Sequence, residues 1–158
     1  MPKESPLKLT FGYAYISNGT PGDSRDSSIE HRFYQEAFFP IKLGKGIYSN
    51  HRFRYEMREM KNQGFRTRYR YNLFINIPLN KQIIEPKTLY LSLYNEIFIN
   101  GQRKIGNGKS VTFFDRNRLY GALGYVFRKG LKMQCGMMRQ TNNSFGKNQL
   151  QLSLHQTF

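Results

Sequence analysis

Three arginines occupy alternate positions in the segment FRTRYRYNLFINI, which spans residues 65–77. Arg66, Arg68 and Arg70 each carry a planar fork of N–H donors that matches a carboxylate or a phosphate. Alternate side chains of a β-strand share one face. The segment therefore predicts a strand with one arginine face, able to pair with acids or bind an anion, and one aromatic and aliphatic face.

A second kind of chemistry would need a nucleophile and a base. Ser153 and His155 fall on one side of a predicted last strand, and Glu96 is a candidate acid. A serine nucleophile needs a histidine within hydrogen-bond reach and a third group that orients the histidine. Residues i and i+2 lie roughly 6.5 Å apart along a strand, which is long for that contact. His31 and His51 have no acidic or hydroxyl partner that the sequence places, so we expect no catalytic residues and no enzyme.

Metal and cofactor chemistry find no support in the sequence. The histidine, cysteine and acidic residues show no spacing typical of a metal site, and no phosphate-binding loop is present. Cys135 is the single cysteine, which excludes an internal disulfide, and we expect it to pack as a small apolar side chain. No metal or cofactor is predicted.

Length and charge set the broad class. The chain has 158 residues, a formal net charge of +15, 13 Phe, 11 Tyr and no Trp. Such a charge points to nucleic acid or to an anionic membrane surface. No segment approaches the ~20 apolar residues of a membrane helix, and the opening MPKESPLKLT lacks the apolar core of a signal peptide. We expect residues 1–6 to be a disordered leader and residues 7–158 to form one domain.

Alternation of apolar and polar residues recurs along the chain, whereas the helical period fits almost nowhere. Eight segments alternate in this way: 7–16, 30–39, 46–60, 65–77, 88–100, 116–127, 131–140 and 149–158. They predict an all-β, up-and-down antiparallel sheet that closes into a barrel. The turn-rich residues 18–28 are expected to be a loop. The longer connections then follow the first, third, fifth and seventh strands, as in transmembrane barrels.

Aromatic residues on the predicted apolar faces gather near the strand ends. Such girdles form where Tyr and Phe meet the headgroups on either side of a bilayer. The predicted girdle residues are Tyr13, Tyr15, Phe65, Tyr69 and Tyr71 at one end and Tyr125, Phe127 and Phe158 at the other. The last strand is amphipathic and ends in Phe158, as outer-membrane barrels do where the barrel-assembly machinery recognises them.

Several strings, taken in order, resemble a bacterial outer-membrane β-barrel family known as domain-of-unknown-function family 2490. They are GYAYIS, EHRFYQEAFF, HRFRYEMR, RTRYRYNLFINIPLN, LYLSLYNEIFIN and FFDRNRLYGALGYVFRKGLKMQCGMMRQ. The resemblance runs from about Leu7 to Phe158. It implies a barrel in the outer membrane of a Gram-negative bacterium, without an established activity and so without catalytic residues to carry over.

Family members resemble secreted precursors and carry further strands before the segment that is similar to GYAYIS. We therefore expect this chain to be a truncated member without its signal peptide and first strands. Its complete barrel would then have more than eight strands.

In a membrane barrel the arginines must face the lumen, because a charge on the lipid side costs ~2–4 kcal/mol at the bilayer midplane. The predicted lumen cluster is Arg52, Arg54, Glu56, Arg58, Arg66, Arg68, Arg70, Glu96, Arg116 and Arg118, which Arg32 and Glu36 are expected to join. An ion-paired filling that stiffens the barrel is the first interpretation. A narrow anion-preferring pathway is the second, since rings of arginine select for anions.

Two other functions remain open. A soluble basic domain that binds single-stranded nucleic acid is the main alternative, but it needs arginines and aromatics on one face, and here they alternate. A lipid hydrolase built on Ser153 and His155 is the weaker one. The predicted partners are outer-membrane lipids and lipopolysaccharide. Arg103, Lys104 and Lys109 of a predicted outer loop could contact its phosphates, although we favour an ordinary solvated loop there.

Overall fold

The computed structural model describes residues 7–20, 23–44, 46–60, 64–106 and 108–157. These residues form eight strands: β1 (Lys8–Thr20), β2 (Asp23–Gly44), β3 (Ile47–Met60), β4 (Arg66–Pro78), β5 (Leu89–Asn100), β6 (Phe114–Arg128), β7 (Leu131–Thr141) and β8 (Gly146–Gln156). The prediction of an all-β chain is confirmed. In this part of the chain no helix is long and apolar enough to cross a membrane.

Each strand pairs antiparallel with the next one along the chain, so the sheet order is β1 to β8 and the predicted up-and-down topology is confirmed. Closure of the sheet is not found. Within the described residues β1 pairs only with β2, and β8 only with β7. A sheet closes only when tilt and stagger bring its first and last strands within pairing distance. These eight strands form one open sheet with two edges.

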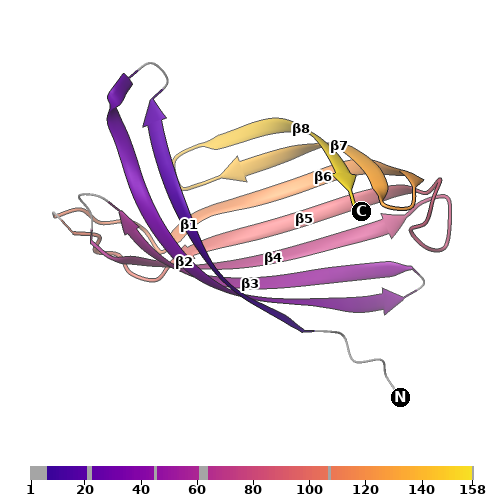
Figure 1. Cartoon of the computed structure of the whole chain (residues 1–158), viewed down its shortest axis with the longest axis horizontal. Helices are drawn as coiled ribbons and strands as arrows, with labels where there is room; N and C mark the ends of the chain where they lie inside the picture. The colour runs from indigo at the N-terminus through magenta and orange to yellow at the C-terminus, as the bar shows by residue number, and fades with distance from the viewer. Residues whose placement is uncertain (1–6, 21–22, 45, 61–63, 107, 158) are drawn as a thin grey trace.

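The sheet is curled, with β1 and β2 bending up at one side and β8 lying at the other (Figure 1). A sheet with no second layer buries its large side chains by curling around them. The buried Glu56, Tyr90 and Ser92, all 0% exposed, therefore mark the concave face. We call the opposite face, which carries Leu9, Phe11 and their neighbours, the convex face.

Residues 18–28 are not the predicted loop. β1 and β2 run through most of this segment, with Asn18 paired to Ser28 and Thr20 to Asp23. Turn propensity is a local preference, and cross-strand pairing overrides it where the hairpin continues. As a result β2 spans 22 residues, about twice the expected strand length.

The predicted alternation of long and short connections is also wrong. A long connection, residues 101–113, does follow the fifth strand, but residues 79–88 form another long connection at the opposite end of the sheet. The 79–88 segment is held to its neighbours by backbone hydrogen bonds, from N–H of Leu79 to the carbonyl of Leu89 and from N–H of Val126 to the carbonyl of Thr88. This loop extends the backbone hydrogen bonding beyond the ends of β4 and β5, and the period-two pattern does not predict it.

Candidate functional site

The candidate site is the charged part of the concave face, and the strand register builds it. Pairing sets Glu56 beside Arg68 and Arg54 beside Arg70 across β3 and β4. The same register continues from Arg70 to Phe98 on β5 and from Phe98 to Arg116 on β6. All ten residues of the predicted cluster lie on this face: Arg52, Arg54, Glu56, Arg58, Arg66, Arg68, Arg70, Glu96, Arg116 and Arg118.

Glu56 is the first of two carboxylates that organise the arginines. Arg68 donates to its Oε2 from Nε at 2.8 Å, with Nη2 at 2.6 Å, and Arg70 donates from Nη1 to its Oε1 at 2.8 Å. Two further guanidinium groups, of Arg32 and Arg54, lie within 3.9 Å. A fully buried carboxylate is stable only with such charge-assisted donors, so Glu56 and its arginines must fold as one unit.

Glu96 is the second carboxylate that organises the arginines. Arg70 contacts its Oε1 through Nε at 3.0 Å and Nη2 at 2.6 Å, and Arg52 donates to the same oxygen at 3.0 Å. The hydroxyl of Tyr94 donates to the other oxygen, Oε2. Arg70 thus bridges Glu56 and Glu96 and links β3, β4 and β5 through side chains.

Three acidic residues flank these two. Glu30 accepts two hydrogen bonds of 2.7 Å from Arg58 and one of 2.8 Å from Arg32. Glu36 accepts from Arg54 at 2.7 Å, which agrees with the expectation that Arg32 and Glu36 join the cluster. The third acid, Asp115, lies 3.3 Å from a donor of Arg68.

The ring of Phe98 lies at the centre of the arginines. The guanidinium carbons of Arg70, Arg118, Arg68 and Arg116 stand 4.5, 4.9, 5.4 and 5.7 Å from its centroid. An aromatic face attracts a cation at these distances. Phe98 is 2% exposed, so it acts as a common apolar support for four positive charges.

A cavity of about 280 Å³ opens beside Phe98. Its walls come from strands as far apart as β1, through Ile16, and β6, through Arg118, because the curl brings them around one space. A second cavity, of about 330 Å³, lies toward the loops after β5 and β7 and shares Arg58 and Arg116 with the first. The two cavities therefore meet at the same arginines.

The rest of the concave face is mostly uncharged, although Arg118 reaches its cavity and Lys132 pairs with His155 across β7 and β8. A cavity of about 330 Å³ there is lined by Tyr94, Tyr120, Ser153 and His155 among others. No hydrogen bond joins Ser153 to His155 in the described part of the chain. The candidate acid Glu96 is engaged by arginines and Tyr94. The structure therefore does not bring the three together as a hydrolytic set.

The convex face carries the predicted girdle residues. Tyr13, Tyr15, Phe65, Tyr69, Tyr125 and Phe127 are exposed there, Tyr71 is half-buried, and Phe158 lies outside the described residues. Phe11, Phe33 and Phe53 add exposed rings between the ends of their strands. The aromatics thus form a continuous area over β1–β4, while exposed Leu and Met side chains prevail over β6–β8.

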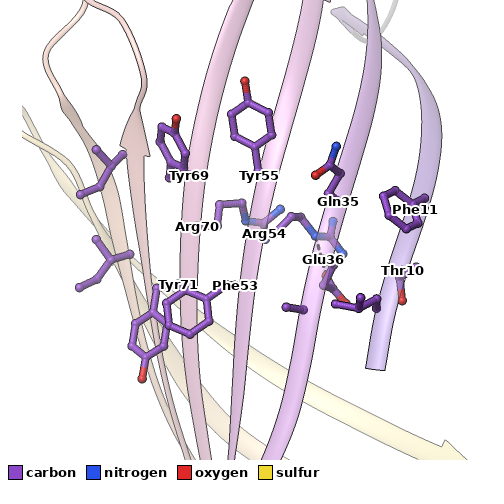
Figure 2. A pocket seen from close by; sticks show the side chains of 14 residues that line it. Thr10, Phe11, Gln35, Glu36, Phe53, Arg54, Tyr55, Tyr69, Arg70 and Tyr71 are labelled. Carbon is purple, nitrogen blue, oxygen red and sulfur yellow. Dashed lines mark hydrogen bonds and ion pairs between the residues drawn. The ribbon is translucent and has the colours of Figure 1, made fainter. Parts of the chain in front are cut away.

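A groove of about 590 Å³ crosses this aromatic area. Its lining includes Phe53 and Tyr55 of β3 and Tyr69 and Tyr71 of β4, which surround it in Figure 2. The rings of Phe53 and Tyr71 pack with centroids 4.6 Å apart. Cys135 also lies on the convex face, among the apolar side chains with which the alternation grouped it, and is exposed there.

Two histidines of the convex face do have hydroxyl partners, contrary to expectation. His31 Nδ1 lies 2.7 Å from the hydroxyl of Tyr13. His51 lies 2.9 Å from the hydroxyl of Tyr71 through Nδ1 and 3.1 Å from Oγ of Ser49 through Nε2. The two tyrosine partners lie on neighbouring strands, so that only the strand register brings them to the histidines. The contact of Ser49 with His51, between residues i and i+2, forms because their side chains lean toward one another. Ser49 is 2% exposed, which closes its hydroxyl to an incoming substrate.

Sequence patterns missed three members of the site. Glu30 and Phe98 could have been found by extending the alternation two residues beyond Arg32 and Glu96. Extending the alternation would not have found Asp115, because the pairing of β5 with β6 shifts register next to this residue.

One comparison with known proteins gave a match. A family model described as a protein of unknown function (DUF2490) matches residues 4–151. No curated protein and no solved structure matched the chain.

Proposed function

The chain belongs to the DUF2490 family of proteins of unknown function, and we propose that it forms the wall of a bacterial outer-membrane β-barrel. In this proposal the convex face contacts the hydrocarbon of the bilayer, and the concave face lines the interior of the barrel. The protein's main role is then structural, as a stiff wall with an ion-paired inner surface, and it is not an enzyme.

The main support for this proposal is that large apolar side chains are exposed while charged side chains are buried. Leu150, Phe11 and Leu152 are 77, 76 and 73% exposed, whereas Glu56 and Glu96 are 0 and 1% exposed. Water-soluble proteins rarely expose large contiguous apolar areas, and such areas mark contacts with membranes or partners. Lipid is the partner that accepts leucine and aromatic side chains over a whole sheet face.

The ion pairs support the structural role. Glu56 and Glu96 draw together arginines from β2 to β6, so side chains as well as backbone bonds hold the strands in register. Such cross-strand pairs of opposite charge stabilise a sheet. Their number fits an interior that is filled and rigid.

A narrow anion-preferring passage is a second candidate, favoured by the excess of arginine over acid. Nine arginines face five acids on the concave face: Arg32, Arg52, Arg54, Arg58, Arg66, Arg68, Arg70, Arg116 and Arg118 against Glu30, Glu36, Glu56, Glu96 and Asp115. Arginine-lined pores select for anions.

The proposed partners follow from the same arrangement. Outer-membrane lipids would cover the convex face, and lipopolysaccharide would lie near the loop residues Arg103, Lys104 and Lys109. The unpaired edge of β8, with Leu150, Leu152 and Leu154 on one face, offers the barrel-assembly machinery a strand to pair with.

The separation of arginines and aromatics onto opposite faces argues against binding of single-stranded nucleic acid. Stacking platforms combine aromatic and cationic side chains on one surface. Here Arg54 and Arg70 lie on the face opposite Tyr55 and Tyr69. Arg54 and Arg70 also border the aromatic groove, but their guanidinium groups are bound to Glu36, Glu56 and Glu96.

The test uses the absence of tryptophan from the chain. A single tryptophan is placed in place of Leu152 on the convex face or of its neighbour Gln151 on the concave face. After refolding into liposomes, we expect lipids brominated in their acyl chains to quench the fluorescence of Leu152→Trp strongly. Gln151→Trp should be quenched much less, because its side chain points away from lipid.

Both variants must first show the β-rich circular dichroism of the parent. Equal quenching of the two tryptophans, or a parent that folds as a monomer without detergent or lipid, would overturn the proposal. The second result would make nucleic acid the next partner to test.

A further inference from the structure

We propose that the cavity beside Phe98 is a binding site for a small phosphate-type oxyanion. The proposal deepens the role of the concave face and rests on the proposed function only in placing this cavity inside the barrel. Its walls contain six arginines: Arg32, Arg58, Arg68, Arg70, Arg116 and Arg118.

The charge inside the cavity is strongly unbalanced. Glu30 is the one acid among its lining residues, and Arg58 and Arg32 already occupy both of its oxygens. Like charges that share a partly desolvated space repel one another. An anion bound between them would offset that repulsion, and the six arginines give it donors on several sides.

The arginines differ in how fully they are engaged. Side chains of Arg32, Arg58, Arg68 and Arg70 are 7–17% exposed and make short contacts with Glu30, Glu56 or Glu96. Arg116 and Arg118 are 34 and 30% exposed. Arg116 donates to its chain neighbour Asp115 at 3.3 Å, and Arg118 donates to the neutral amide of Gln140 at 2.8 Å, with Glu96 farther away at 3.7 Å. These two arginines of β6 retain the most donors for a ligand.

The geometry favours a phosphate group over other anions. A carboxylate is planar and a halide has no directional acceptors, whereas a phosphate presents oxygens in several directions and is recognised by guanidinium forks. The arginines reach the cavity from β2, β3, β4 and β6, which suits such a group. A volume of about 280 Å³ admits a phosphate with a few further atoms.

A route to the cavity is also present. The neighbouring cavity toward the loops is polar, with Asn100, Thr112 and Asn142 in its lining, and shares Arg58 and Arg116 with the site. An anion entering from the loop end would meet the exposed guanidinium of Arg116 first. The apolar ring of Phe98 below the arginines limits water there and strengthens the contacts.

Isothermal titration calorimetry of the full chain in detergent micelles tests the site. Inorganic phosphate and glycerol 3-phosphate are titrated separately in chloride buffer. We expect saturable binding of one equivalent, weakened at least about ten-fold in the double variant Arg116→Gln/Arg118→Gln, because the variant loses two charged hydrogen-bond donors to the ligand.

The control is Arg103→Gln/Lys109→Gln, which removes the same charge from the loop and should bind like the parent. Tighter binding of glycerol 3-phosphate would identify a phosphorylated solute as the ligand, and equal binding would identify free phosphate. Absence of saturable heat, or equal weakening in both double variants with folding retained, overturns the site. Micelle binding does not require insertion into lipid, so failure here is separable from failure of the brominated-lipid test.

Discussion

The concave face has two halves that bury their side chains by different means. Near the β3–β4 turn, arginines and carboxylates surround Phe98, and the buried groups are held by ion pairs. Toward the β6–β7 turn the buried side chains are uncharged, and Tyr90 lies 0% exposed without a charged partner among the described residues. We call them the charged half and the neutral half.

The neutral half relies on shape. Tyr90 lies across Gly124, its partner on β6, so closely that a Cβ added to Gly124 would stand 2.3 Å from Cζ of the ring. Its hydroxyl accepts a hydrogen bond of 3.0 Å from Nε2 of Gln134 on β7. The same packing of a tyrosine across a glycine also occurs in the charged half, where Tyr34 lies across Gly12 and contacts the guanidinium of Arg54. The contrast indicates that charge is concentrated where a ligand could use it, while packing and a neutral hydrogen bond hold Tyr90 in the other half.

Removing the central acid should have the largest effect. Glu56→Gln replaces the buried carboxylate that Arg68 and Arg70 share with a neutral amide, so that Arg68 keeps only the 3.3 Å contact with Asp115 and Arg70 only Glu96 among the described acids. Breaking a buried pair costs about 3–5 kcal/mol. We expect a loss of this size in the free energy of unfolding, measured by urea titration in micelles with circular dichroism as the signal.

Glu85→Gln is the matched control. Glu85 is 46% exposed on the loop before β5 and pairs with Lys81, and exposed pairs are worth about 0–1 kcal/mol. If both variants lost the same stability, the charged half would not depend on its buried ion pairs.

A methyl group added at Gly124 should lower the stability of the protein by less than Glu56→Gln does. Gly124→Ala places a Cβ against the ring of Tyr90, which is fully buried and has no room to move. Overpacking of this kind costs about 1–3 kcal/mol, and thermal unfolding in micelles would measure it.

Gly121→Ala, on the convex side of the same strand, is the comparison. There the nearest atom to an added Cβ is Cδ2 of Leu93 at 3.8 Å, an ordinary contact. This variant should unfold at the temperature of the parent, and an equal drop in both would trace the effect to glycine's backbone rather than to Tyr90.

The sequence predicted the face of the sheet on which a side chain lies better than it predicted which side chains lie next to one another. Period-two alternation placed Arg54, Glu56 and Arg70 on one face, because that assignment needs only the strand geometry. It did not place Phe98 among the arginines, since the row across β3 to β6 depends on hairpin registers that local sequence does not determine.

The conformation of the loops and the closure of the sheet could not be predicted from the sequence. Residues 18–28 carry turn residues yet pair as a hairpin, which only the facing strand decides. Whether β1 meets β8 depends on twist and stagger accumulated over eight strands, a property of the whole sheet. The hydrogen bond between Ser49 and His51 likewise required side-chain directions that spacing does not give.

The smallest effect is expected from the hydroxyl of Tyr90. Tyr90→Phe keeps the ring over Gly124 but leaves Nε2 of Gln134, 5% exposed overall, without its acceptor. A single neutral hydrogen bond is worth about 1 kcal/mol, so urea titration should show a loss near that value. In the double variant Tyr90→Phe/Gln134→Met the orphaned amide is gone as well, and most of the stability should return, because replacing both partners by apolar groups is nearly neutral. The central pairs of the charged half allow no such exchange, since Arg68 and Arg70 each contact two acids. If Tyr90→Phe instead cost as much as Glu56→Gln, the neutral half would depend on polar contacts too, and the division of the concave face into a charged half and a shape-packed half would fail.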